Sequence, residues 1–163
     1  MDAADTPDWS RERRHGWEPS KALLASIRDY QAAATRSNPI AALRKKLAVL
    51  RYRFWSAVTG ADIPLNAQIA GGLVMPHPNG IVIHPDSVIG PNCMIFHQVT
   101  LGTDGVGVPR LAGNVRIGAG AKLVGPIYVG ANAQIGANAV VLHDVPANAT
   151  VAGIPARILK ITG

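Results

Sequence analysis

Three of the five histidines occupy one position of a six-residue repeat, which makes them the first candidates for chemistry. His77, His97 and His143 each stand two residues after an aliphatic side chain of that repeat. Counting repeats places His77 and His97 in neighbouring turns of the chain, about 4.8 Å apart if the turns are spaced like strands in a sheet. Imidazole changes its charge near neutral pH, so a stacked pair beside an insertion is a candidate for acid–base chemistry. A lone histidine at such a corner is more often a surface residue.

The repeat that must position these histidines begins after Ala61, and its period fits neither a helix nor an ordinary strand. Flat short strands joined by tight turns, three to a coil, place one aliphatic side chain per turn inside a triangular prism. The pattern slips by two residues once and is interrupted by an insertion at 103–110. It therefore predicts a mainly β protein with a parallel β-helix over residues 61–163. The aliphatic positions are Ile63, Ile69, Met75, Ile81, Ile83, Ile89, Ile95, Leu101, Leu111, Ile117, Leu123, Val129, Ile135 and Val141.

The chain before the repeat has helical spacing and predicts a short α-helical region over residues 20–60. Apolar residues recur every three or four positions, and Asn38 followed by Pro39 is typical of a helix N-cap and first turn. We expect helices at 20–35 and 39–59. Residues 1–19 show no periodicity, so we interpret them as a loose arm or a strap on a neighbouring subunit.

Composition excludes several classes of protein. The single cysteine, Cys93, excludes an internal disulfide and a zinc cluster of several thiolates, and we expect no metal. Eleven of the sixteen Lys and Arg residues precede residue 60. Such a basic helix could meet nucleic acid or anionic lipid, but a solvated face is the favoured interpretation, so we expect no nucleic-acid partner. No apolar run is long enough for an integral membrane segment and the N-terminus is too charged for a secretory signal, which predicts a cytoplasmic protein.

Several segments, in order, resemble the serine acetyltransferase branch of the hexapeptide-repeat acyltransferases. The resemblance covers about residues 61–158. It implies that the β-helix is left-handed and that the protein is an O-acetyltransferase. The segments are Ala61-Asp62-Ile63-Pro64, Gly80-Ile81-Val82-Ile83, Val99-Thr100-Leu101-Gly102, Ile117-Gly118-Ala119-Gly120-Ala121-Lys122 and Ala152-Gly153-Ile154-Pro155-Ala156-Arg157.

The resemblance implies a catalytic pair of His77 with Asp62, which stands fifteen residues earlier. His77 would be the general base that takes the acceptor's hydroxyl proton during attack on a thioester. Asp62 would hold the imidazole in the correct tautomer and stabilise the imidazolium. From spacing alone, a turn cap before Ile63-Pro64 is an equally good interpretation of Asp62.

The same resemblance implies acetyl-CoA as donor, lying in the groove between two subunits of a homotrimer. Small residues would let the backbone approach the pantetheine arm, and basic residues would meet the phosphates. The insertion resembles the family's loop that folds over the neighbouring site. The expected coenzyme-binding residues are Gly102, Thr103, Ala119, Ala121, Lys122 and Arg157.

The acceptor positions depart from the family pattern. Pro76 stands where the family has an aspartate that binds the amino group of serine, and Gly107-Val108 stand where it has an Arg-His pair for the carboxylate. A zwitterion such as serine loses the water around both charges when it binds, and without charged partners in the site nothing compensates for that loss. We therefore predict a neutral alcohol or an exopolysaccharide-type sugar as acceptor, with His97 binding its hydroxyls. The alternatives are an L-serine O-acetyltransferase of cysteine biosynthesis and, in another class, a noncatalytic β-helix scaffold.

Overall fold

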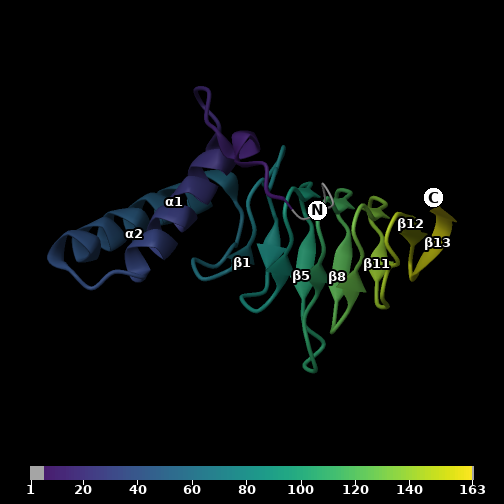
Figure 1. Ribbon diagram of the computed structural model, residues 1–163. Coiled ribbons are helices and arrows are strands. Elements are labelled where there is room, and N and C mark those ends of the chain that lie inside the picture. The colour runs from purple at the N-terminus through teal and green to yellow at the C-terminus, as the bar shows by residue number, and fades with distance from the viewer. Residues whose placement is uncertain (1–5, 163) are drawn as a thin grey trace.

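The fold is a stack of β coils with a helical hairpin at one end, as Figure 1 shows for this computed structural model, which describes residues 6–162. A 3₁₀ helix, Trp9–Glu12, precedes α1 (Pro19–Ala34) and α2 (Pro39–Thr59), within one residue of the predicted bounds. Residues 1–5 of the predicted arm lie outside the described part. The strands are β1 (Gln68–Ile69), β2 (Val82–Ile83), β3 (Val88–Ile89), β4 (Met94–Ile95), β5 (Thr100–Gly102), β6 (Arg110–Leu111), β7 (Arg116–Ile117), β8 (Lys122–Val124), β9 (Tyr128–Val129), β10 (Gln134–Ile135), β11 (Val140–Val141), β12 (Ala149–Gly153) and β13 (Ala156–Ile161).

The strands form three sheets, one on each side of the prism, which confirms the predicted β-helix. Their orders are β1-β3-β6-β9, β2-β5-β8-β11 and β4-β7-β10-β12-β13. All pairs are parallel except β12 with β13, which closes the last coil with an antiparallel strand. The registers place hexad residues opposite one another, as with Ile83 and Leu101. The insertion after β5 leaves this register intact, because Leu101 also pairs with Leu123.

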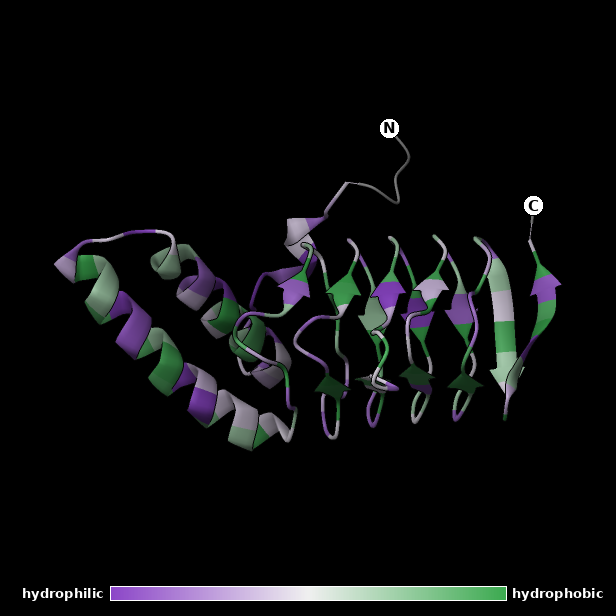
Figure 2. Ribbon diagram, turned by 90° about the horizontal axis from the view of Figure 1, so that it is seen from below, coloured by the Kyte–Doolittle hydropathy of each residue, from purple (hydrophilic) through white to green (hydrophobic). Residues whose placement is uncertain are grey.

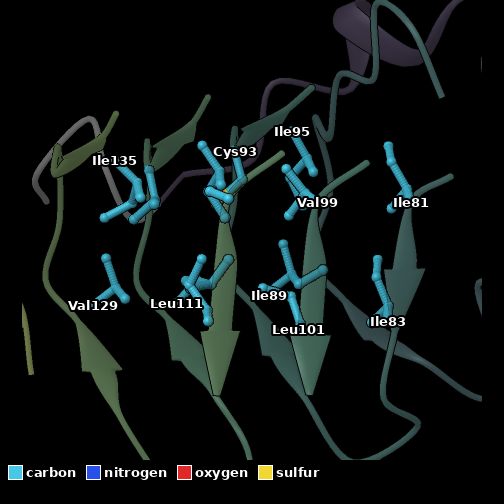
Figure 3. Close-up of a cluster of buried hydrophobic side chains, with 14 of the residues drawn as sticks. Ile81, Ile83, Ile89, Cys93, Ile95, Val99, Leu101, Leu111, Val129 and Ile135 are labelled. Carbon is cyan, nitrogen blue, oxygen red and sulfur yellow. The ribbon is translucent and has the colours of Figure 1, made fainter. Parts of the chain in front are cut away.

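The interior of the prism is a stack of aliphatic side chains. Figure 3 shows them in rows that run along the stack. The strand registers pair Ile83 with Leu101 and Ile89 with Leu111. Leu101, Ile95 and Ile117 have no exposed surface at all. Cys93 lies among them, and burial raises the pKa of its thiol to about 11, so the thiol stays protonated at neutral pH. One aliphatic residue per turn therefore suffices to fill the core without large aromatic side chains.

Two corners of the prism require left-handed backbone, and glycine, asparagine and one glutamine provide it. At the corner that precedes β4 and its sheet neighbours, the asparagines also bond to one another along the stack. The Asn114 side chain donates to that of Asn132 at 3.2 Å, and Asn132 donates to Asn148 at 3.0 Å. The positive-φ residues of the two corners are Gly60, Gly80, Gln98, Gly120 and Asn138, and Gly72, Asn92, Asn114, Asn132 and Asn148.

The first helix covers the open end of the coil stack. Leu23, Leu24 and Ile27 of α1 belong to the same buried cluster as the coil interior. The Arg28 guanidinium donates to the Ala70 carbonyl at 2.8 Å and to the Glu12 carboxylate at 3.0 Å. An uncovered first coil would expose unpaired strand edges. The helical region and the coils therefore share one core. Residues 6–12 bond to the first coils of their own chain, and Arg14 and Trp17 contact Trp55 of α2.

Candidate active site

His77 lies at the corner of the first coil, between Pro76 and Pro78. Both prolines restrict the backbone, which holds the imidazole outward on a stiff turn. The ring is exposed and faces a groove of about 600 Å³. The groove lies where the start of α1, the end of α2 and the first coil meet, and it is lined by Trp17, Glu18, Pro19, Ser20, Lys21, Leu24, Val58, Thr59, Leu73, Val74, Met75, Pro76, His77, Pro78 and Asn79.

His97 lies in the next coil and meets His77 edge to face. The ring centroids are 6.2 Å apart and the ring planes are 76° apart. In the described residues, the Nδ1 atom of His97 is buried and has no hydrogen-bond partner. The structure thus brings the two imidazoles together, with one buried nitrogen left for a ligand or a water molecule to satisfy.

The two rings do not stack in register because the first coil carries two additional residues. The backbone N–H of Gln98 donates to the carbonyl of Asn79 at 2.9 Å. In the backbone register between the two coils, His97 is therefore opposite Asn79 and not opposite His77. The extra residues bulge outward as the Pro76–Pro78 turn. This bulge is what brings His77 to the groove, whereas His97 is half-buried and does not line it.

Asp62 lies on an outer face of the prism, where it forms a β-bridge with Val82. Its side chain is exposed and is not part of the groove wall. Among residues 6–162, no hydrogen bond or ion pair joins its carboxylate to His77, and none caps the following turn. Burial and the Asp62 charge together raise the pKa of the neighbouring Tyr52. The pairing of Asp62 with His77 stays a prediction.

Two charged residues of the groove were not found from the sequence. Glu18 and Lys21, at the start of α1, form an ion pair with 2.8 Å between Oε1 and Nζ, and their side chains are 29% and 23% exposed. The bond from Lys21 and a backbone N–H of His15 lower the pKa of Glu18. Their spacing is that of an ordinary pair on a helix surface. Only the tertiary structure places this pair in the same groove as His77.

The insertion forms a projecting loop after β5 (Figure 1). The Asp104 carboxylate accepts from the N–H groups of Val106 at 2.9 Å and Gly107 at 3.1 Å, and these bonds lower its pKa. Val106 at the tip is 83% exposed, while Val108 is half-buried. Of the predicted acceptor residues Pro76, His97 and Val108, only Pro76 lines the groove with His77. Within one chain, the loop does not complete the site.

The predicted coenzyme residues are spread along the coil stack. Gly102, Thr103 and Ala119 lie at its surface, and Lys122 lies one coil beyond Thr100, donating to the Gln98 carbonyl and to the Thr100 hydroxyl. Arg157 is exposed on β13, in the last coil and thus far along the stack from His77.

Ala121 does not fit its predicted role at the coenzyme. It is completely buried in the prism. Its N–H donates to the Gly118 carbonyl, and its carbonyl accepts from Thr100. Because both backbone groups are already paired inside the coil, Ala121 offers a ligand neither a side chain nor a free amide.

No group of three or more His, Cys, Asp or Glu side chains in the described residues is placed to hold a metal ion. The groove instead combines an exposed imidazole with one anionic and one cationic side chain. This arrangement can remove a proton from a small molecule that carries charges of both signs.

Comparison with known proteins identifies both the repeat and its relatives. Residues 109–143 match the family described as bacterial transferase hexapeptide (six repeats). The chain is 43% identical over 110 residues to the serine acetyltransferase of Synechococcus elongatus, covering 65% of this chain and 45% of that protein. The chain thus spans about half the length of the curated relatives it matches.

Solved structures agree with this match. A serine acetyltransferase in complex with CoA superposes with a TM-score of 0.74 at 38% identity, over 88% of this chain and 58% of the other. The soybean serine acetyltransferase complexed with serine superposes with a TM-score of 0.69 at 34% identity, over 86% of this chain and 56% of the other.

These relatives contradict the predicted neutral alcohol or sugar acceptor, since the matching proteins are serine acetyltransferases. The prediction relied on Pro76 in the first coil and on Gly107 and Val108 in the insertion, three positions that lack charge. It did not consider Glu18 and Lys21, two charged residues at the start of α1 that the structure places in the groove beside His77.

Proposed function

We propose that this protein is an L-serine O-acetyltransferase that uses acetyl-CoA. Its repeat, sequence and fold match the serine acetyltransferase branch of the hexapeptide-repeat acyltransferases. The observation that carries the proposal is the match across the coils to serine acetyltransferases, combined with an exposed imidazole at the groove. The donor is supported by the related structure in complex with CoA.

His77 is the general base of the proposed reaction. The imidazole takes the proton of the serine hydroxyl while its oxygen attacks the thioester carbonyl of acetyl-CoA. The new C–O bond forms, the C–S bond breaks, and the proton passes to the departing thiolate of CoA. Asp62 orients the imidazole and stabilises the imidazolium.

Glu18 and Lys21 bind the charged ends of serine. The carboxylate of Glu18 receives the α-ammonium group, and the Lys21 ammonium receives the α-carboxylate. In the structure these side chains satisfy each other at 2.8 Å, so serine exchanges one ion pair for two. Hydrogen bonds between charged groups contribute more than neutral ones, which favours the zwitterion over an uncharged alcohol.

The pantetheine arm of acetyl-CoA lies along the coils from His77 toward Lys122. Gly102, Thr103 and Ala119 form a surface of small side chains on this path, and Arg157 on β13 lies five strand spacings beyond the first coil, about 24 Å. An extended pantetheine arm with its phosphates can span such a distance.

We propose that the enzyme is a homotrimer with its sites between subunits. The support is that the loop bearing Val108 does not reach the groove of its own chain. Light scattering should give the mass of three chains. A monomer that is fully active would contradict both the trimer and the shared site.

The place of action that we propose is the cytoplasm, where acetyl-CoA is available to the reaction. None of the helices in residues 6–162 is long and apolar enough to cross a membrane.

Thiol release from acetyl-CoA tests the function. L-serine should release CoA and yield O-acetylserine by mass spectrometry, whereas L-alanine, which has no hydroxyl, should not. Equal release with both amino acids, or none with either, would reject the proposal, and the second outcome would favour the scaffold alternative.

Removing either charge of the groove should weaken serine recognition. We expect Glu18→Gln and Lys21→Met each to raise the KM for L-serine by about 10- to 100-fold, because one end of the zwitterion loses a charge-assisted partner. The KM for acetyl-CoA should not change. The matched control is Asp29→Asn, which breaks the ion pair of α1 with Arg51 outside the groove. A serine KM that changes as much in the control would contradict the assignment.

A further inference from the structure

The outer face of α2 carries a continuous apolar stripe. Its residues are spaced by three or four positions, so they lie along one side of the helix. Each is at least 44% exposed, although all are large and hydrophobic. Figure 2 shows the hydrophobic bands along the helical hairpin, which extends beyond the coil stack. We name this set the α2 stripe: Ile40, Leu43, Leu47, Leu50, Phe54 and Val58.

The α2 stripe is not the face by which α2 joins the protein. The buried residues of α2 are Ala41, Ala48 and Thr59. Tyr52 and Trp55 on that side pack against the buried cluster. The helix therefore has two apolar faces, and the protein's own core uses only the one with small residues.

Cations border the α2 stripe on both sides. In helical spacing, Arg44 and Arg51 follow one edge and Lys46 and Arg53 follow the other. Residues 39–59 contain no Asp or Glu. A helix with an exposed apolar stripe between two rows of cations has the pattern of helices that lie in the interface of an anionic membrane.

A basic groove opens beside the α2 stripe. It has a volume of about 580 Å³ and contains Arg36, Arg44 and Arg51, of which Arg51 is paired with Asp29 in the same groove. Ile40 and Leu47 of the stripe form part of its wall. One surface thus offers guanidinium groups for phosphates next to side chains for acyl chains.

Aromatic side chains continue the surface at the end of α2. Phe54 contacts Trp55 edge to face at 4.9 Å, and Trp55 contacts Trp17 at 5.4 Å between ring centroids. Trp17 is 75% exposed. Exposed tryptophan beside apolar side chains is typical of the headgroup level of a bilayer.

A second copy of this chain is a poor occupant of the α2 stripe. Two stripes packed together would place rows of cations against each other. The acids near α2 are already used, because Glu12, Glu18 and Asp29 form ion pairs with Arg28, Lys21 and Arg51. Beyond residue 60 the chain has only four acids against five Lys and Arg. The part of the chain that the structure describes, residues 6–162, therefore offers a second copy no acidic surface to match α2.

We propose that the α2 stripe binds the surface of an anionic phospholipid bilayer. The helix lies in the plane of the interface, with the stripe among the acyl chains and the bordering cations on lipid phosphates. The coil stack then extends from the membrane into the solution. This role is separate from the acetyl transfer, and the two surfaces share only Val58 and Trp17 at the edge of the groove.

Flotation of the full chain with lipid vesicles tests the proposal. The protein should float with vesicles of equimolar phosphatidylcholine and phosphatidylglycerol but not with phosphatidylcholine alone. High salt should reduce the bound fraction, since it screens the lipid charge. Leu50→Asn should lower the partition coefficient by about tenfold, because one side chain no longer leaves water.

The matched control is Leu159→Asn. Leu159 on β13 is 66% exposed, the same as Leu50, but lies outside the α2 stripe. This variant should float like the wild type, and both variants should keep the wild-type mass and acetylation rate. Flotation of Leu50→Asn at the wild-type level would overturn the proposal. So would wild-type protein that binds neither vesicle, which would leave an acidic protein helix as occupant, or a changed mass of Leu50→Asn, which would make the stripe a contact between copies.

Discussion

Replacing His77 by alanine should lower kcat/KM for serine acetylation by about 10²- to 10⁴-fold, the usual contribution of a general base. No other imidazole lines the groove, and the neighbouring His97 is half-buried in the next coil. The affinity for CoA should stay within a few-fold, because its proposed contacts lie along the coils. Thiol release and calorimetric titration with CoA measure the two effects separately.

The control for this prediction is His84→Ala. His84 is half-buried in the first coils, and its imidazole bonds within its own turn, where Nδ1 accepts from the N–H of Asp86 at 3.2 Å. We expect this variant to keep its activity. Near-normal turnover of His77→Ala, or an equal loss in both variants, would remove His77 from the role of base.

Replacing Gly118 by alanine should destabilise the fold by about 3 kcal/mol, at the upper end of the cost of overpacking. A Cβ atom there would lie 2.6 Å from the backbone nitrogen of Ala137 and 2.9 Å from the carbonyl carbon of Gly136. These are backbone atoms of the next coil, so they cannot move without separating two coils. Urea denaturation should show the loss as a lower midpoint.

Gly102→Ala is the matched control for stability. Both glycines follow a hexad aliphatic residue, and neither has a positive φ. At Gly102, however, the closest atom to an added Cβ is the Thr100 methyl group at 3.7 Å, an ordinary contact. We expect a change within about 1 kcal/mol. Equal midpoints for the two variants would show that coil spacing does not determine the need for glycine.

The histidine pair shows how far counting along the chain reaches. The six-residue period correctly indicates that His77 and His97 belong to neighbouring coils, because each coil is made of consecutive residues. It does not predict that the two additional residues of the first coil push Pro76–Pro78 outward. The outward turn places the rings edge to face and brings only His77 to the groove.

The prediction of a neutral alcohol or sugar acceptor was wrong for a related reason. A comparison with a family motif considers only the residues that align with that motif. A groove is formed by residues from elements that are far apart in the sequence. Glu18 precedes His77 by fifty-nine positions, yet α1 covers the first coil and places both in one groove. The order of residues carries no information about this contact, since it depends on how the helices pack on the end of the stack.

Sequence alone determined the β-helix and the two helices, because those features repeat locally and one aliphatic residue per turn is enough to specify a coil. The same local patterns do not predict which segments lie next to one another in the folded protein. They make Gly102 and Gly118 equivalent, and they mark two apolar faces on α2 without ranking them. The tertiary structure decided both. Of these two glycines, only Gly118 has backbone atoms of the adjoining coil close to it. On α2, the small side chains of Ala41 and Ala48 are buried, while Leu43, Leu47 and Leu50 remain exposed to solvent. The physical reason is that close packing depends on distances between segments that meet only after folding.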